Sequence, residues 1–146
     1  MSEKDTNLDF INEVYRNANV GLLSISEIMQ SVTDSELRKE LLSEYDGYEK
    51  TAGEIAGYMK DKGYEAKELG GMKKTMMSTG IKMKTAMDDS VGHIAEMMIK
   101  GTVTGITELY KILNDADSVT DKKAVEYAEK LKSLEENYEE NLKKFL

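Results

Sequence analysis

The chain has 146 residues, a length typical of one domain. Its 20 basic and 28 acidic residues give a net charge of −8, which disfavours nonspecific binding to nucleic acids. Cysteine is absent, which excludes disulfides, thiolate metal ligands and a cysteine nucleophile. Proline is absent as well, so no helix is interrupted by a proline kink.

The chain carries no sequence signal for secretion or membrane insertion. Its first ten residues, MSEKDTNLDF, are polar and lack the apolar stretch of a signal peptide. No run approaches the roughly 18 to 20 apolar residues of a membrane span. We therefore expect a soluble, cytoplasmic, single-domain protein over residues 1–146, without membrane contact.

Apolar residues recur at alternating steps of three and four in several long segments, which is the pattern of amphipathic helices. No segment alternates with a period of two, so no strand is expected. Thr33 and Glu36 have the spacing of a capping box, Ser90 suits a helix start and Gly63 a helix end. The pattern predicts helices over residues 6–31, 34–62, 72–87, 89–114 and 119–145.

Four long amphipathic helices with short connections predict an all-α fold. The expected architecture is an antiparallel four-helix bundle with a short extra helix between the second and third long helices. Gly53 and Gly57 lie four residues apart, as do Gly101 and Gly105, so each pair places a flat patch on one helix face. The pairs favour close helix packing, and room for a ligand in the bundle is the alternative.

Two stretches carry a resemblance to a known superfamily. The segments NANVGLLSISEIM, residues 17–29, and IAEMMIKGTVTGITELYKIL, residues 94–113, resemble helices of ferritin-like proteins. The helical pattern over nearly the whole chain is similar to a bacterial family of uncharacterised ferritin-like four-helix bundles. The resemblance implies a ferritin-like bundle. In members that use oxygen it also implies a two-metal centre, built from one Glu on each of two helices and Glu-x-x-His on the other two.

The ligand positions that this resemblance implies are largely not filled by metal-binding residues. The chain contains no Glu-x-x-His, and its only histidine, His93, precedes Glu96 in the reverse order. On the first helix the comparable inward position is Asn19, and on the third it is Thr102. The resemblance therefore supports the fold and argues against di-iron chemistry.

The second and fourth helices keep some carboxylates near the inner face. Glu49 lies beside the inner stripe of the second helix. Glu135 interrupts the apolar stripe of the last helix, with Tyr138 at the place of the histidine. Glu108 on the third helix faces inward only if that helix rotates slightly. Together these three glutamates are the candidate ligands of an iron or manganese site.

Glu135 is the sharpest anomaly in the pattern. A buried carboxylate is costly unless it is hydrogen-bonded, paired or bound to metal. If Glu135 points inward without a metal, we expect its pKa to be raised, because burial disfavours the charged form. The structural alternative is that Leu134 takes the core position and Glu135 lies at its edge.

Tyrosines predominate among the aromatic residues, with eight tyrosines against two phenylalanines. Their hydroxyls require hydrogen-bond partners when buried. We expect an aromatic core with polar groups, and the alternative is a polar pocket inside the bundle. The polar residues expected in the bundle interior are Tyr15, Tyr45, Tyr48, Thr102 and Tyr138.

The segment 71–87 differs from the rest of the chain, since it carries four lysines, five methionines and no acidic residue. Methionine side chains suit adaptable apolar surfaces. We expect a lid over the bundle, and the alternatives include a contact with a protein partner or with a second copy of the chain. Copper(I) or membrane-surface binding is a remoter alternative.

Two functions remain open on this basis. The preferred one is a non-enzymatic ferritin-like bundle of interaction or structural type that has lost the di-metal site and binds no cofactor. The alternative is a metal-binding or oxidase-like protein with a carboxylate and tyrosine site centred on Glu135. Hydrolases and nucleotide-binding proteins are disfavoured, because no Gly-x-Ser-x-Gly motif and no glycine-rich phosphate loop are present.

Overall fold

The computed structural model describes residues 2–67, 69, 80–82, 84–85 and 88–146. Within these ranges the chain is almost entirely helical and forms no strand, as the periodicity predicted. Three of the long helices continue into a 3-10 turn. The elements are α1 Glu3–Ile28, η1 Met29–Ser31, α2 Ser35–Lys62, α4 Val91–Asn114, η2 Ala116–Ser118, α5 Lys122–Leu142 and η3 Lys143–Phe145.

Only part of the Met- and Lys-rich segment 71–87 can be compared with its prediction. Residues 80–82 and 84–85 are helical. The rest of the segment lies outside the described residues, and so does most of the surface expected to serve as a lid or a partner contact.

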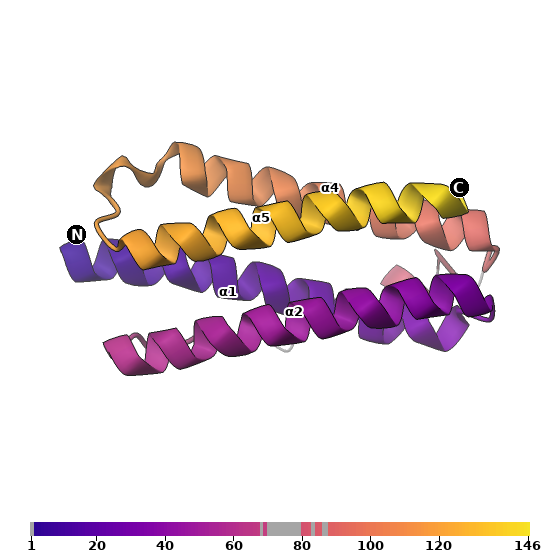
Figure 1. Cartoon of the computed structure of the whole chain (residues 1–146), viewed down its shortest axis with the longest axis horizontal. Coiled ribbons are helices and arrows are strands. Elements are labelled where there is room, and N and C mark those ends of the chain that lie inside the picture. The colour runs from indigo at the N-terminus through magenta and orange to yellow at the C-terminus, as the bar shows by residue number, and fades with distance from the viewer. Residues whose placement is uncertain (1, 68, 70–79, 83, 86–87) are drawn as a thin grey trace.

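The four long helices form two hairpins, α1 with α2 and α4 with α5, which pack against each other (Figure 1). α2 ends near the N-terminus of the chain, whereas α4 begins at the opposite end, beside the C-terminus (Figure 1). Consequently α2 and α4 run in the same direction. The expectation of short connections and antiparallel order throughout is therefore wrong, because Lys62 and Val91 lie at opposite ends of the bundle. Helical periodicity reports which face is buried and carries no information on direction.

The helix ends follow local capping chemistry. Ser90 caps α4 by accepting a hydrogen bond from the backbone amide three residues on, and Gly63 ends α2 in the left-handed conformation with φ 71°, both as predicted. The expected cap at Thr33 is displaced by one residue. Asp34 caps α2 instead, because its Oδ2 accepts a hydrogen bond of 2.9 Å from the Leu37 amide.

The core follows the apolar stripes of all four helices. Each fully buried Leu or Ile side chain contributes roughly 1.5–3 kcal/mol of burial free energy. The largest buried apolar side chains, all less than 2% exposed, are Ile11, Ile25, Ile28, Leu37, Leu41, Ile55, Met59, Ile94, Leu109, Leu131 and Leu142.

At the N-terminal end of the bundle, five polar residues form what we call the Asp121 cluster: Asn7, Tyr58, Tyr64, Thr120 and Asp121. The Asp121 carboxylate accepts hydrogen bonds from the Tyr58 hydroxyl at 2.6 Å and the Tyr64 hydroxyl at 2.8 Å. Asn7 Oδ1 accepts from the backbone amides of Thr120 and Asp121. Burial opposes ionisation of Asp121, but the two tyrosine hydroxyls stabilise the carboxylate, and its pKa lies below the usual value.

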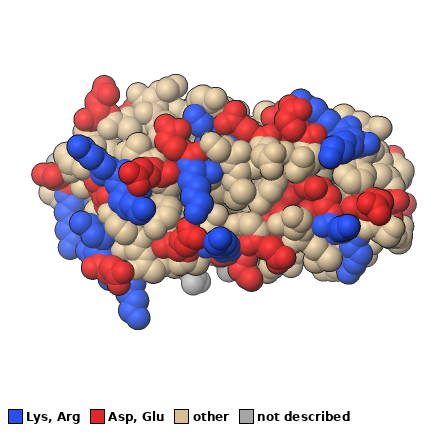
Figure 2. Space-filling model, in the orientation of Figure 1, with Lys and Arg blue, Asp and Glu red and all other residues tan. Residues whose placement is uncertain are grey.

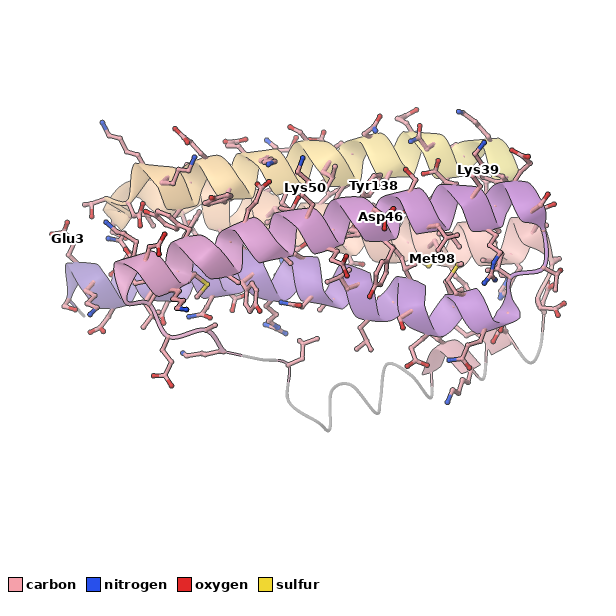
Figure 3. All side chains as sticks on the ribbon, turned by 60° about the horizontal axis from the view of Figure 1, so that its bottom comes forward. Glu3, Lys39, Asp46, Lys50, Met98 and Tyr138 are labelled. Carbon is pink, nitrogen blue, oxygen red and sulfur yellow. The ribbon has the colours of Figure 1, made fainter. Side chains whose placement is uncertain are left out.

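The outer surface carries charges of both signs, interspersed over the face shown in Figure 2. The labelled residues Glu3, Lys39, Asp46 and Lys50 are exposed on the outside of the bundle, whereas Met98 and Tyr138 lie between the helices (Figure 3). Among the described residues, no helix is long and apolar enough to cross a membrane.

Candidate functional site

A cavity of about 1110 Å³ lies between α1 and α4, in the half of the bundle away from the Asp121 cluster. Small side chains on both helices leave this space, among them Gly21 and Ser24 on α1 and Gly101 on α4. Two other helices close its inner side. The residues that α2 and α5 contribute to the lining are Glu44, Tyr48 and Glu135.

Glu135 is buried at the cavity, with 3% of its surface exposed. A Cβ atom on Gly105 of α4 would stand 2.6 Å from Glu135 Oε2, so the glycine makes room for the carboxyl group. The Tyr48 hydroxyl donates a 3.0 Å hydrogen bond to Glu135 Oε2. Burial raises the pKa of Glu135 to about 8, although the Tyr48 hydrogen bond acts in the opposite direction. The carboxyl is therefore predominantly protonated at neutral pH.

Two further glycines admit the tyrosines beside Glu135. A Cβ on Gly21 would stand 2.6 Å from the ring of Tyr48, and the Tyr138 hydroxyl occupies the place of a Cβ on Gly47. The Tyr48 and Tyr138 rings pack edge to face, with centroids 5.3 Å apart. We call Tyr48, Glu135 and Tyr138, with the three glycines that they contact, the central polar layer.

Glu44 lies one turn before Tyr48 on α2 and is only 1% exposed. Burial, with the nearby Glu40 carboxyl as a second cause, raises the pKa of Glu44 to about 10. Its Oε2 atom is buried and has no hydrogen-bond partner in the described part of the chain. Glu44 is thus a second neutral carboxyl at the cavity.

Asn17 and His93 also present unpaired atoms. The Asn17 side-chain amide donates a 2.9 Å hydrogen bond to the Gly105 carbonyl, and its Oδ1 is buried without a partner. His93 Nδ1 lies 4.0 Å from Asp88 Oδ2, and its Nε2 is buried without a partner. With Glu44 Oε2 and Glu135 Oε1, these are all the buried unpartnered side-chain atoms among the described residues, and every one belongs to a residue that lines the cavity.

The acidic and basic side chains around the cavity are mainly acidic, and two of the acids, Glu44 and Glu135, are neutral. The carboxyl groups in its lining are Glu13, Glu44, Asp88, Glu96, Glu108 and Glu135. Against these six, the described lining contains three basic residues, Arg16, Lys84 and Lys100. The lining also has an apolar part, which includes Val20, Ile28, Ile81, Met97 and Met98.

The three glutamates that sequence reasoning grouped as metal ligands do not come together. Glu135 points into the bundle, as the stripe indicated. Glu49 is exposed on α2 and does not line the cavity. Glu108 is exposed at the cavity rim and pairs with Lys111 at 3.3 Å. Glu49 lies beside the buried stripe of α2, as expected, and this stripe also contains Glu44.

Of the five predicted interior polar residues, Tyr48, Tyr138 and Thr102 are buried. Tyr15 and Tyr45 are only half-buried and line a separate hollow of about 280 Å³ beside α1 and α2. Asn19 belongs to the same hollow, and its side chain is bonded to the Tyr15 carbonyl. The inward amide of α1 is therefore Asn17 instead of Asn19.

The glycine pairs also differ from expectation. A Cβ on Gly53, Gly57 or Gly101 would meet nothing within 4 Å, so no neighbouring helix packs closely against these three glycines. Gly101 lines the cavity and Gly105 contacts Glu135. Gly105 is thus closely packed as expected, and the alternative interpretation, room for a ligand, fits Gly101 alone.

The residues present do not fit a ferritin-like two-metal centre. In the described ranges, no three His, Asp or Glu side chains come together as metal ligands would. Glu44 and Glu135 are two buried carboxyls on α2 and α5. Directly beside Glu135, α1 supplies the amide of Asn17, and α4 supplies Gly105, which has no side chain to offer a metal.

Comparison with known proteins does not assign the chain to a family. No protein-family model matches it, and neither a curated protein nor a solved structure gives a match.

Proposed function

We propose that this protein is a non-enzymatic, ferritin-like helical bundle that binds a small organic ligand in the cavity between α1 and α4. The observation that carries the proposal is the coincidence of the cavity with the unpaired polar atoms. Buried polar atoms are normally hydrogen-bonded, and leaving one unpaired costs about 1–3 kcal/mol. Four such atoms around one cavity are expected where a ligand supplies the missing partners.

The topology supports the ferritin-like part of the proposal. Bundles of the ferritin type have one long crossover between two helix hairpins. Here α2 and α4 run in the same direction, so the connection from Lys62 to Val91 leads from one end of the bundle to the other. The buried carboxyls of α2 and α5 occupy the bundle interior, where di-metal members hold their ligands.

The shape and lining support a binding role. Small-molecule sites are typically clefts of about 300–1,000 Å³ with an apolar lining and a few convergent polar groups. The cavity reaches that size and combines the methionine and aliphatic side chains with the central polar layer.

The test uses a neutral fluorescent probe, N-phenyl-1-naphthylamine, whose emission rises in apolar surroundings. We expect the probe to bind the unmodified protein. The Gly101→Leu substitution places a large side chain in the cavity without a steric clash at the helix. It should weaken probe binding about tenfold, which corresponds to 1.4 kcal/mol.

Gly57→Leu is the matched control. Gly57 is also an exposed helical glycine with no atom within 4 Å of its Cβ position, but it does not line the cavity. Gly57→Leu should leave probe binding unchanged. Absence of probe binding to the unmodified protein, or equal effects of the two substitutions, would contradict the proposed cavity function.

A further inference from the structure

The hydrogen-bonding capacity of the cavity's inner wall restricts the kind of ligand that it can hold. Asn17 has already used a side-chain N–H on the Gly105 carbonyl and presents its oxygen, an acceptor. The Thr102 hydroxyl donates to the Met98 carbonyl at 2.7 Å. Glu135 Oε2 accepts from Tyr48, which leaves Oε1 unpaired. On the neutral acid the proton sits on Oε1, since Oε2 accepts from Tyr48, so Oε1 becomes an acceptor when Glu135 ionises. Asn17 Oδ1 and the ionised Glu135 Oε1 are therefore the deep oxygens that lack donors.

The side chains of Asn17 and Glu135 both lie against Gly105 of α4. Asn17 is bonded to its carbonyl, and the Glu135 carboxyl fills the place of its missing side chain. The two side chains beside Gly105 each have an unpaired oxygen, one of an amide and one of a carboxyl group. An ammonium group has three N–H donors and no acceptor, which matches this pair.

Resting on the proposed function, we propose that the ligand is an amphipathic organic cation, a primary amine with an apolar chain, whose ammonium group binds Glu135 Oε1 and Asn17 Oδ1. Its apolar chain lies along the methionine and aliphatic part of the lining. With Glu44 and Glu135 neutral, the described lining has four other carboxyls against three basic residues, so the unpaired acceptor oxygens favour a cation more than the surrounding charge does.

Binding of the amine is coupled to the protonation of Glu135. Without a ligand, the pKa of the Glu135 carboxyl is raised to about 8, so the carboxyl carries a proton at neutral pH. An ammonium group bound beside it favours loss of that proton to solvent. The amine keeps its own proton, since an alkylammonium has a pKa near that of lysine, about 10.4. Amine affinity should therefore rise by up to about tenfold per pH unit below pH 8 and level off above it.

Within the central polar layer, Glu135 is the group with an unpaired atom that ionises near pH 8. On α2 it faces Tyr48 and Glu44, and on its own helix Tyr138, all of which have raised pKa values and stay protonated near pH 7. The charged lining residues of α1 and α4 are exposed. They are Glu13, Arg16, Glu96, Lys100 and Glu108, and His93 on α4 is half-buried.

The experiment compares n-octylamine with 1-octanol and sodium octanoate by isothermal titration calorimetry. We expect octylamine to bind at least about tenfold more tightly than octanol, a difference of 1.4 kcal/mol or more. Titrations near pH 7 in two buffers of different ionisation enthalpy should show release of close to one proton per amine and none with octanol. This measurement uses the unmodified protein, so it does not depend on the folding of a variant.

Glu135→Gln keeps the shape of the side chain and removes its charge. It should weaken octylamine binding about tenfold or more, abolish proton release and leave octanol binding within about twofold. Glu49→Gln, at the exposed position on the same bundle, should change none of these. Equal binding of amine and alcohol, preference for octanoate, or Glu135-dependent binding of Mn²⁺ or Fe²⁺ would overturn the amine assignment.

The naphthylamine probe distinguishes a wrong ligand class from the absence of any binding function of the cavity. If the probe binds in a Gly101-dependent manner while octylamine shows no dependence on Glu135, the ligand class is wrong and the cavity function stands. If neither the probe nor octylamine binds, both proposals fail.

Discussion

The two ends of the bundle treat buried polar groups in opposite ways. In the Asp121 cluster, both carboxylate oxygens of Asp121 accept hydrogen bonds, and Asn7 is bonded through both its oxygen and its amide. At the cavity end, Glu44 and Glu135 each have an oxygen without a partner. The same chain can therefore pair its buried polar atoms completely. The unpaired atoms at the cavity are a local property of that site instead of a general defect of packing.

The pKa values express the same contrast. The Asp121 carboxylate is stabilised by tyrosine hydroxyls, so its pKa is lowered although burial acts against ionisation. Glu135 receives only one tyrosine hydrogen bond in a more deeply buried place, and its pKa is raised to about 8. One end is thus built around a carboxylate, and the other around neutral carboxylic acids.

The largest expected effect is that of Glu135→Gln on stability at alkaline pH. Because the folded-state pKa is raised, the unmodified protein loses stability as the pH rises from about 4.5 to about 8, and Gln removes this loss. Each pKa unit between 4.5 and about 8 corresponds to about 1.4 kcal/mol, so the variant should be more stable by roughly 4 kcal/mol at pH 8 and nearly equal below pH 4.5. Urea unfolding across this pH range, without ligand, measures the difference.

Glu49→Gln is the control for this titration, and its stability should follow the unmodified protein at every pH. A Glu135→Gln variant that is less stable than the unmodified protein at pH 8 would show that the carboxyl is already charged and paired in the free protein. The contrast between the two ends would then disappear.

Asp121→Ala tests the fully paired end. The substitution removes a helix N-cap and leaves the Tyr58 and Tyr64 hydroxyls without their acceptor. We expect a loss of about 2–3 kcal/mol in the free energy of unfolding, since a cap contributes about 1 kcal/mol and each hydrogen bond about as much. Thermal unfolding measures the loss. Asp117→Ala, at an exposed position in the adjacent turn, should be nearly neutral.

The pH dependence at this end has the opposite sign. The lowered pKa of Asp121 means that its contribution is present above the unfolded-state pKa and is lost as the carboxylate is protonated in acid. The stability difference between Asp121→Ala and the unmodified protein should shrink below about pH 4. A difference that is independent of pH would indicate that the cap geometry contributes and the charge does not.

Gly105→Leu and Gly101→Leu compare two positions one helical turn apart. A side chain at 105 collides with the Glu135 carboxyl, so we expect a loss of about 1–3 kcal/mol from overpacking. A side chain at 101 meets open space, and the variant should gain up to about 1 kcal/mol because glycine is a poor helix former. Thermal melts of both variants at neutral pH give the two signs. Equal gains would show that Glu135 moves away from Gly105 without cost.

The sequence alone predicted much of the fold and only part of the site. The four helices and the inward position of Glu135 follow from the periodicity of the apolar residues. Glu44 was missed because Tyr45 was taken as the stripe residue, although Leu41, Glu44 and Tyr48 have the same three-and-four spacing. A charged residue on a buried stripe was the available signal. The contacts of Gly21 and Gly47 could not be predicted, since they depend on which partner helix lies opposite.

The central polar layer has a consequence for how the two halves of the molecule assemble. The contacts of Gly21 with Tyr48 and of Gly105 with Glu135 lie within the α1–α2 and α4–α5 hairpins, so each hairpin can form them by itself. The Tyr48 to Glu135 hydrogen bond and the contact of Tyr138 with Gly47 join one hairpin to the other. Apolar stripes tolerate sliding by a turn, whereas these two pairs match in only one alignment. The layer therefore fixes the register in which the two hairpins pack against each other, and the cavity lies where that register leaves α1 and α4 incompletely packed.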